Sequence, residues 1–155
     1  MSGRGPPLER IEMMIANRPE ELARVSARLD DLAARRGLPL DAVSDMHVAL
    51  DEVLTNILSH AYDDAGTHDI RIVLAAYPDA LQAEIEDDGR PFDPRNVPPP
   101  DRSAPLAERK VGGLGIHFVR NLLSELAYQR IGELNRLMLT RSLIANAGTD
   151  NDGAG

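Results

Sequence analysis

The feature that most constrains the fold is a long, one-sided helix expected from about Asp41 to Tyr62, with Asp41 as its N-cap. Apolar residues recur along this segment at intervals of three or four and therefore share one face: Met46, Leu50, Val53, Ile57 and Ala61. A continuous apolar face of this length has to be covered by a second layer of the protein. The rest of the chain must therefore supply that layer.

The remaining elements alternate in a way that indicates a sheet under helices. A strand is expected at Leu8–Ile15, and then a helix that opens at Pro19 and ends at Gly37, with Leu22, Val25, Leu29, Leu32 and Ala33 on its apolar stripe. Two hairpins are expected, at 69–77 with 81–87 and at 127–131 with 135–143, and a helix at about 114–125 precedes the second. This order predicts an α/β (α+β) two-layer sandwich, whose mixed, mostly antiparallel sheet carries helices on one face.

Composition narrows the function classes. The 155 residues are enough for one domain, and the formal charge of −8 argues against a nucleic-acid-binding surface or docking on an anionic membrane. There is no cysteine and no apolar run of membrane-spanning length, so a cytoplasmic protein is expected. The Gly/Pro-rich residues 1–7 and the tail 146–155 are expected to be disordered, on either side of one domain at 8–145.

Three polar residues occur along the long helix at a helical spacing. Glu52, Asn56 and His60 are four residues apart, so they line one edge of the helix beside its apolar stripe. A solvated polar face would give the same pattern. Asparagine is a poor helix former, however, and its place in mid-helix indicates that its side chain is used. For His60, a structural role near the helix end and an approach to a phosphate are both open.

Two glycine-containing segments flank a proline-rich stretch. Asp87 ends a strand and Gly89 follows it; this could be an ordinary turn, or an acceptor for an exocyclic amine beside a glycine that lets a flat ring approach. Gly112, Gly113 and Gly115 open a helix, where free N–H groups suit a phosphate chain, although a flexible hinge is the alternative. Between them, residues 89–113 hold six prolines, and a loop of this length in a compact domain is usually functional or mobile.

Taken in order, these segments resemble the N, G1 and G2 boxes of the Bergerat (GHKL) ATPase superfamily. Within it, the chain looks most like the stand-alone anti-sigma factor serine/threonine kinases. That likeness is carried by the phrase Asp-Glu-x-x-Thr-Asn-x-x-x-His-Ala-Tyr over residues 51–62 and by the last hairpin, Tyr128…Gly132-x-x-Asn135-x-Leu137-x-Leu139. The resemblance covers about residues 8–143.

The resemblance implies a role for each matching residue. Asn56 would ligate Mg²⁺ on the ATP phosphates, Glu52 would be the general base, and Asp87, with Gly89, would read adenine. Gly112, Gly113, Leu114 and Gly115 would meet the phosphates, and residues 94–111 would form the ATP lid. The chain departs from the pattern at Pro91, where a second glycine is common, and at Val111, where some members carry arginine. Arg109 and Lys110, just upstream, are the basic residues that could replace that arginine.

The implied function is an ATP-dependent anti-sigma factor and protein-serine kinase, which phosphorylates a STAS-type antagonist and sequesters a sigma factor. A homodimer formed through the first strand and helix is also implied by resemblance. Pro91 and Val111 favour, a little, the alternative of a nucleotide-dependent regulatory binding module without kinase activity. A third hypothesis, a detached histidine-kinase catalytic domain, is less favoured because His47 lies inside the helix of the ATP site, where it is badly placed to accept a phosphoryl group.

Overall fold

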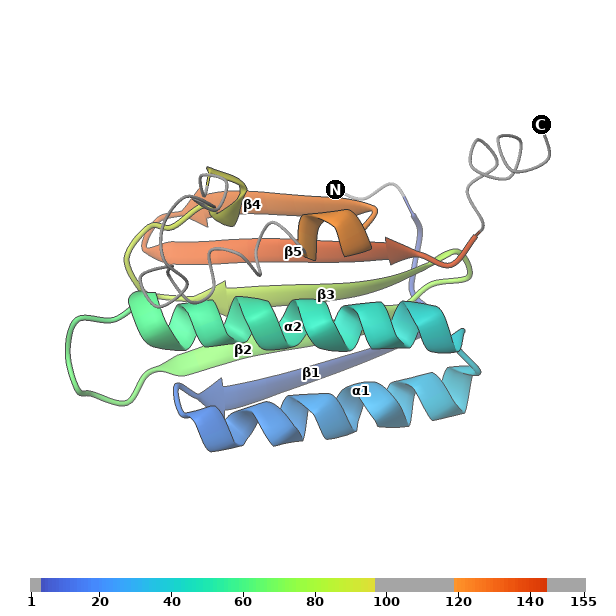
Figure 1. Ribbon diagram of the computed structural model, residues 1–155, viewed down its shortest axis with the longest axis horizontal. Helices are drawn as coiled ribbons and strands as arrows, with labels where there is room; N and C mark the ends of the chain where they lie inside the picture. The colour runs from blue at the N-terminus through green and yellow to red at the C-terminus, as the bar shows by residue number, and fades with distance from the viewer. Residues whose placement is uncertain (1–3, 97–118, 145–155) are drawn as a thin grey trace, which may run out of the picture.

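A computed structural model describes residues 4–96 and 119–144 (Figure 1). The strands are β1 (Glu9–Ala16), β2 (Asp69–Ala76), β3 (Ala80–Asp87), β4 (Glu125–Ile131) and β5 (Leu134–Ser142). The helices are α1 (Leu22–Arg36) and α2 (Leu40–His60), and there are short 3-10 turns at η1 (Pro19–Glu21) and η2 (Pro94–Asn96). Residues 119–122 are also helical.

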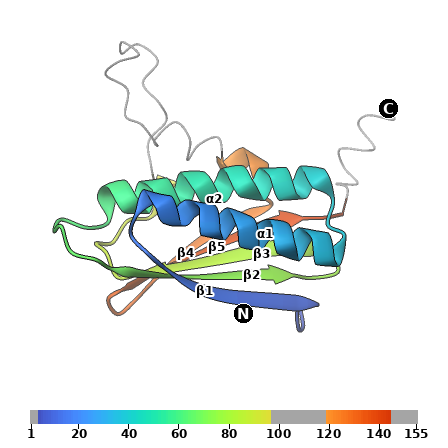
Figure 2. The same ribbon diagram turned by 90° about the horizontal axis from the view of Figure 1, so that it is seen from below.

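The five strands form one sheet in the order β1-β2-β3-β5-β4, and every adjacent pair is antiparallel. Both hairpins expected from the sequence, β2–β3 and β4–β5, are present. Figure 2 shows α1 and α2 side by side on the same face of the sheet. The two-layer sandwich with helices on one face is therefore confirmed. The prediction of a mixed sheet is wrong for the described strands, because no neighbouring pair among them, including β1–β2 and β3–β5, is parallel.

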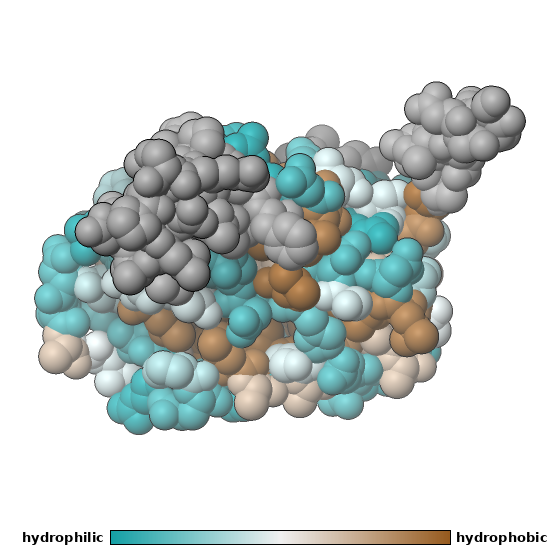
Figure 3. Space-filling view, in the orientation of Figure 1, coloured by the Kyte–Doolittle hydropathy of each residue, from teal (hydrophilic) through white to brown (hydrophobic). Residues whose placement is uncertain are grey.

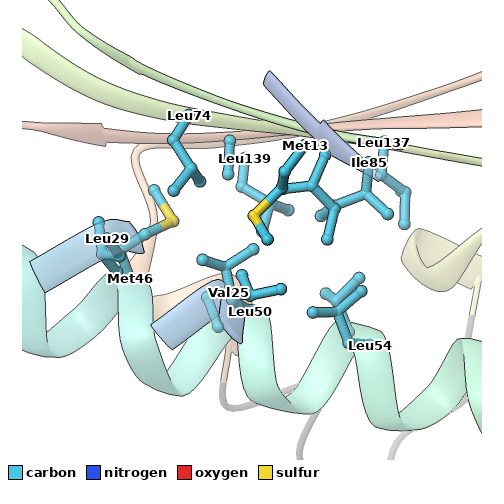
Figure 4. Close-up of a cluster of buried hydrophobic side chains, with 14 of the residues drawn as sticks. Met13, Val25, Leu29, Met46, Leu50, Leu54, Leu74, Ile85, Leu137 and Leu139 are labelled. Atoms are coloured by element: carbon cyan, nitrogen blue, oxygen red, sulfur yellow. The ribbon is translucent and has the colours of Figure 1, made fainter. Parts of the chain in front are cut away.

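The core lies between this face and the two helices. All five predicted α2 residues are buried: Met46, Leu50, Val53, Ile57 and Ala61. Figure 4 shows residues of α1, α2 and the sheet meeting there, including Leu29, Met46, Leu74 and Ile85. Full burial of one such side chain contributes about 1.5–3 kcal/mol to folding. The long apolar face of α2 thus fixes how the helix lies on the sheet.

The element ends are set by local chemistry. Gly37 has a left-handed φ of 59° and ends α1 as expected, since this conformation is easiest for glycine. The prediction that Asp41 caps α2 is wrong: the N-cap is Pro39, and Asp41 lies in the first turn, where its carboxylate accepts the N–H of Ala42. The helix predicted at about 114–125 is also too long, because β4 already begins at Glu125.

None of the described helices covers the opposite face of the sheet, and charged residues of that face pair across strands. Arg71 on β2 contacts Glu12 on β1 at 2.6 Å and Glu84 on β3 at 2.8 Å. Arg136 on β5 pairs with Glu86 on β3 at 2.5 Å. Alternation along each strand sends apolar residues to the helices and these charges to the other side. In the described part of the chain, no helix has the length and apolar character to cross a bilayer.

Candidate functional site

The candidate site lies where α2 and β3 end. Both elements run toward the same end of the molecule, at the left in Figure 1. The two ends are joined directly, since the N–H of Arg90 donates to the carbonyl of Ala61 at 2.9 Å. Arg90 also donates from its side chain to the carbonyl of His60 at 2.6 Å and to Asp63 at 2.7 Å. The sheet topology thus brings the predicted helix motif and the predicted strand-end motif to one place.

Asn56 lies one turn before the end of α2, and it is only 6% exposed. Its amide nitrogen donates both to the carbonyl of Glu52, at 2.8 Å, and to the Glu52 carboxylate, at 2.9 Å. Because the nitrogen is turned toward Glu52, the carboxamide oxygen faces the other way and is the acceptor that Asn56 offers to its surroundings. Asn56 and Glu52 therefore form one positioned polar pair.

Asp87 is the buried acid of the site, at 3% exposure. Its Oδ1 accepts hydrogen bonds from the N–H of Gly89 at 2.9 Å and from the side-chain amide of Asn135 at 3.0 Å. Burial raises the pKa of Asp87 above its ordinary value, and the Asn135 and Gly89 hydrogen bonds oppose that rise. One carboxylate oxygen is thus fixed by the protein, which sets the direction of the other.

Asn135, at the start of β5, organises this corner. Its amide nitrogen donates to Asp87, to the carbonyl of Arg90 at 2.9 Å and to that of Gly89 at 3.3 Å. Its oxygen accepts the hydroxyl of Tyr128 at 2.5 Å. The family resemblance of the last hairpin included Asn135 but implied no role for it. The available signal was its polar side chain directly after the Gly132 turn, at the head of an apolar strand.

Gly89 is required here by the protein itself. A Cβ at this position would lie 2.5 Å from both the Cβ and the carbonyl oxygen of Ala61, far inside van der Waals contact. The carbonyl of Gly89 also accepts from Arg130 at 2.8 Å. The expectation that glycine leaves room for a flat ring is not tested by this contact. The observed close approach is between the β3 end and the α2 end.

The third member of the predicted polar stripe behaves differently. His60 is exposed, and its backbone carbonyl accepts a hydrogen bond from Arg90; this contact does not involve the imidazole and so does not test its role. Next to it, the ring of Tyr62 stacks on His68 with centroids 4.1 Å apart. The Tyr62 hydroxyl is buried and makes no hydrogen bond with the described residues, and burial, followed by the nearby charge of Asp87, raises its pKa.

The remaining predicted site residues lie outside the described residues: Arg109, Lys110, Val111, Gly112, Gly113, Leu114 and Gly115. Of the predicted lid at 94–111, the structure describes the beginning, residues 94–96. There Asp93 pairs with Arg95 at 2.7 Å, and Arg120 donates to the Arg95 carbonyl at 3.0 Å.

The predicted disordered ends fall mostly outside as well; of the first seven residues, Arg4 pairs with Asp79 at 2.8 Å.

Comparison with known proteins gives a consistent result. Residues 15–141 match the family model described as the histidine kinase-like ATPase domain. The chain is 33% identical over 150 residues to the serine-protein kinase RsbW of a Bacillus cereus strain, covering 94% of this chain and 91% of that protein. The RsbW protein of Bacillus thuringiensis subsp. konkukian is similar to the same extent.

Two solved structures share the fold. One contains the RsbU and RsbW domains of Rv1364c from Mycobacterium tuberculosis, with a TM-score of 0.61 and 17% identity; the match covers 91% of this chain and 34% of that longer one. The other is the blue-light activated histidine kinase EL346 of Erythrobacter litoralis, with a TM-score of 0.52, 20% identity and coverage of 80% and 41%. At these identities the likeness concerns the fold alone.

Proposed function

Because this chain belongs to the histidine kinase-like ATPase domain family, we propose that it is an ATP-dependent protein-serine kinase that also acts as an anti-sigma factor. Its relatives over nearly the whole length are named serine-protein kinases. The observation that supports the proposal is that α2, which carries the Asn56–Glu52 pair, and β3, which ends at the buried Asp87, run to the same end of the molecule and are joined there. The fold joins these motifs through the Gly89–Ala61 contact.

Asp87 is the proposed adenine-binding residue. With one oxygen held by Gly89 and Asn135, the carboxylate has an oriented second oxygen that can accept a hydrogen bond from the 6-amino group. A buried carboxylate needs such partners, because burial without full compensation is costly. Adenine binding would supply one and would favour the charged form of Asp87.

Asn56 is the proposed Mg²⁺ ligand. Its amide oxygen is the type of ligand that Mg²⁺ accepts, and this ion usually takes only one or two protein ligands besides phosphates and water. The described residues contain no group of three His, Asp or Glu side chains that could hold a metal ion. When bound, the ion would neutralise phosphate charge and help to orient the transferred group.

Glu52 is the proposed general base. Its carboxylate is fixed by the Asn56 amide at 2.9 Å, so the residue that would hold Mg²⁺ also positions the base. A base at this place would accept the proton of a substrate serine hydroxyl as the oxygen attacks the γ-phosphate. Gly112, Gly113, Leu114 and Gly115, with Arg109 and Lys110 on the lid at 94–111, are proposed to hold the phosphates.

The proposed partners follow from the same family assignment. The substrate is a STAS-type anti-sigma factor antagonist, the sequestered protein is a sigma factor, and the chain works in the cytoplasm as a homodimer. The edge strand β1 and the adjacent α1 are the proposed dimer surface, since β1 pairs on only one side among the described strands.

The kinase proposal is tested by incubating the chain with labelled ATP, Mg²⁺ and a STAS-type antagonist from the same organism. Label on an antagonist serine is the expected result. Tight ATP binding without any label transfer would contradict it.

The second candidate is a nucleotide-dependent binding module without catalysis, which Pro91 and Val111 favour because they depart from the kinase pattern. Glu52→Gln separates the two. A kinase should lose label transfer and keep ATP binding, whereas a pure binding module has no transfer to lose and should keep its partner affinity unchanged. Glu125→Gln, on the exposed end of β4, is the matched control.

A further inference from the structure

A groove runs between α1 and α2 on the side of α2 away from the candidate nucleotide site. Its volume is about 430 Å³, and its lining residues are Leu22, Val25, Ser26 and Asp30 from α1 and His47, Val48, Leu50, Asp51 and Leu54 from α2. Asp51 and Asn56 are five positions apart, which places them roughly 140° apart around the helix. The groove is therefore not part of the site described above.

The groove has apolar side chains at its edges. Val25, Leu50 and Leu54 lie beneath it in the core and are at most 3% exposed, so the apolar surface open to solvent belongs to the partly buried Leu22 and to Val48, which is 41% exposed. Figure 3 shows apolar side chains among polar ones along the band where α1 and α2 run side by side. A hydrophobic side chain that entered here would be removed from water on several sides, which is favourable.

The rim of the groove is acidic. Asp30 and Asp51 stand on opposite helices, and none of the described residues that line the groove is lysine or arginine. Asp51 is exposed and makes no ion pair with any residue in the described ranges, 4–96 and 119–144. The basic side chains of a bound segment would thus meet a carboxylate on each helix, of which Asp51 has no ion-pair partner among the described residues and Asp30 is in contact with His47.

Side-chain hydrogen bonds between α1 and α2 restrain one wall of the groove. His47 on α2 contacts Ser26 on α1 through Nδ1 at 3.3 Å and Asp30 through Nε2 at 2.7 Å. These contacts tie the two helices together across the groove and restrain the rotamers of all three side chains. A binding surface restrained in advance loses less conformational freedom on association.

We propose that this groove is a docking site for a protein segment that carries an apolar side chain flanked by lysine or arginine. The apolar side chain would lie against Leu22 and Val48, and the basic groups would face Asp51 and Asp30. The groove is open along its rim, which suits a side chain presented by another protein better than an enclosed small molecule. The inference goes beyond the proposed kinase activity, and nucleotide takes no part in it.

The test is an NMR titration of the labelled full chain with two short, end-blocked amphipathic helical peptides. One is built of leucine and lysine, and the other has glutamate at every lysine position. The lysine peptide should shift the amide signals of the groove-lining residues, whereas the glutamate peptide should not. Equal binding of both peptides, or shifts confined to another surface, would overturn the proposal.

Matched variants separate the groove from the overall negative charge. Asp51→Arg should weaken binding of the lysine peptide on the order of tenfold, since a favourable charge becomes a repulsive one. Glu125→Arg, the same charge change at an exposed residue, should alter the affinity less than about twofold if the groove is the site, because Glu125 does not line the groove and lies on β4, at the sheet edge opposite β1, where solvent and salt screen its charge. Equal losses in the two variants would overturn the proposal.

Val48→Ser provides a second line of evidence that involves no charge. It removes apolar surface from an exposed position, so it should leave the fold intact and still weaken peptide binding several-fold. Phenethylamine serves as a small-molecule probe; its saturable binding in the groove without peptide binding would assign the groove to small ligands and refute protein docking. ATP-dependent thermal stabilisation, measured on the same samples, reports separately whether the nucleotide proposal fails.

Discussion

Replacing Asp87 by asparagine should separate nucleotide recognition from stability. The Oδ1 of Asp87 accepts from the Gly89 N–H and from Asn135. The oxygen of an asparagine can keep both hydrogen bonds, and its amide nitrogen then takes the place of the other carboxylate oxygen. The 6-amino group of adenine would face a donor instead of an acceptor. We therefore expect Asp87→Asn to bind ATP much more weakly than the parent chain.

The size of the loss follows from two contributions. A hydrogen bond to a charged group contributes about 1.5–3 kcal/mol, and a buried donor without a partner costs about 1–3 kcal/mol more. Even near the lower end of this sum, about 3 kcal/mol, the ATP affinity falls by roughly a hundredfold or more. GTP presents an oxygen at the corresponding position of its base, so the preference for ATP over GTP should shrink or reverse.

Although Asp87→Asn should weaken ATP binding, it should not lower the stability of the nucleotide-free chain. Burial raises the pKa of Asp87, so the folded chain binds a proton there more readily than the unfolded chain, whose ordinary value is 3.8. As pH rises from 3.8 through the raised value, the unfolding free energy therefore falls, and the cost of the buried charge remains at higher pH. Asparagine carries no such charge, and the nucleotide-free variant should be at least as stable as the parent at neutral pH.

Thermal unfolding and calorimetric titration with ATP and GTP at neutral pH would test both parts. Asp88→Asn is the matched control, since its side chain is 51% exposed and next in sequence. It should bind ATP nearly as the parent does. An Asp87→Asn chain that binds ATP within about threefold of the parent, or that unfolds well below it, would refute the reasoning.

Three further predictions concern the surroundings of the site. Gly89→Ala should lower the unfolding free energy by about 1–3 kcal/mol, because its Cβ would overlap Ala61. Adding Ala61→Gly to this variant should restore only part of the lost stability, since the Ala61 carbonyl is equally close. An unchanged melting temperature of Gly89→Ala would contradict the contact. Asn135→Ala should cost about 1–3 kcal/mol and weaken ATP binding, because the Arg90 carbonyl loses its Asn135 donor and Asp87 keeps only the Gly89 N–H. ATP affinity equal to that of the parent would argue against Asn135 positioning Asp87. The hydrogen bond to Asp64 raises the pKa of His68, so the protonated histidine stabilises the fold fully below the ordinary pKa of 6.5, and this stabilisation is lost as pH rises through the raised pKa. An NMR titration should give a lower His68 pKa in Asp64→Asn. An unchanged pKa would show that Asp64 is not the cause.

Much of the fold could be predicted because periodicity reports which face of an element is buried. The α2 stripe from Met46 to Ala61 and both hairpins were identified in this way. Local capping was less certain: Pro39, with its fixed φ, starts α2 before Asp41 can act as the cap.

The sequence could not reveal the contacts that build the site. Asn135 and Asp87 are 48 residues apart, and the approach of Gly89 to Ala61 depends on how α2 lies on the sheet. Periodicity identifies a buried position but not its partner across the fold. The motif resemblance pointed to Asn56 and Asp87 individually, whereas Asn135 became visible only as the residue that bridges Asp87 and the backbone after it.

The central claim, that Asn56 and Asp87 hold opposite ends of one nucleotide, is tested most directly by calorimetric titration of the parent chain, Asn56→Ala and Asp87→Asn. Each is titrated with adenosine, and with ATP in the presence and absence of Mg²⁺. Adenosine affinity should depend on Asp87 and not on Asn56, while the gain in ATP affinity from Mg²⁺ should disappear only in Asn56→Ala. A Mg²⁺ gain that survives in Asn56→Ala, or adenosine binding that survives in Asp87→Asn, would contradict the account.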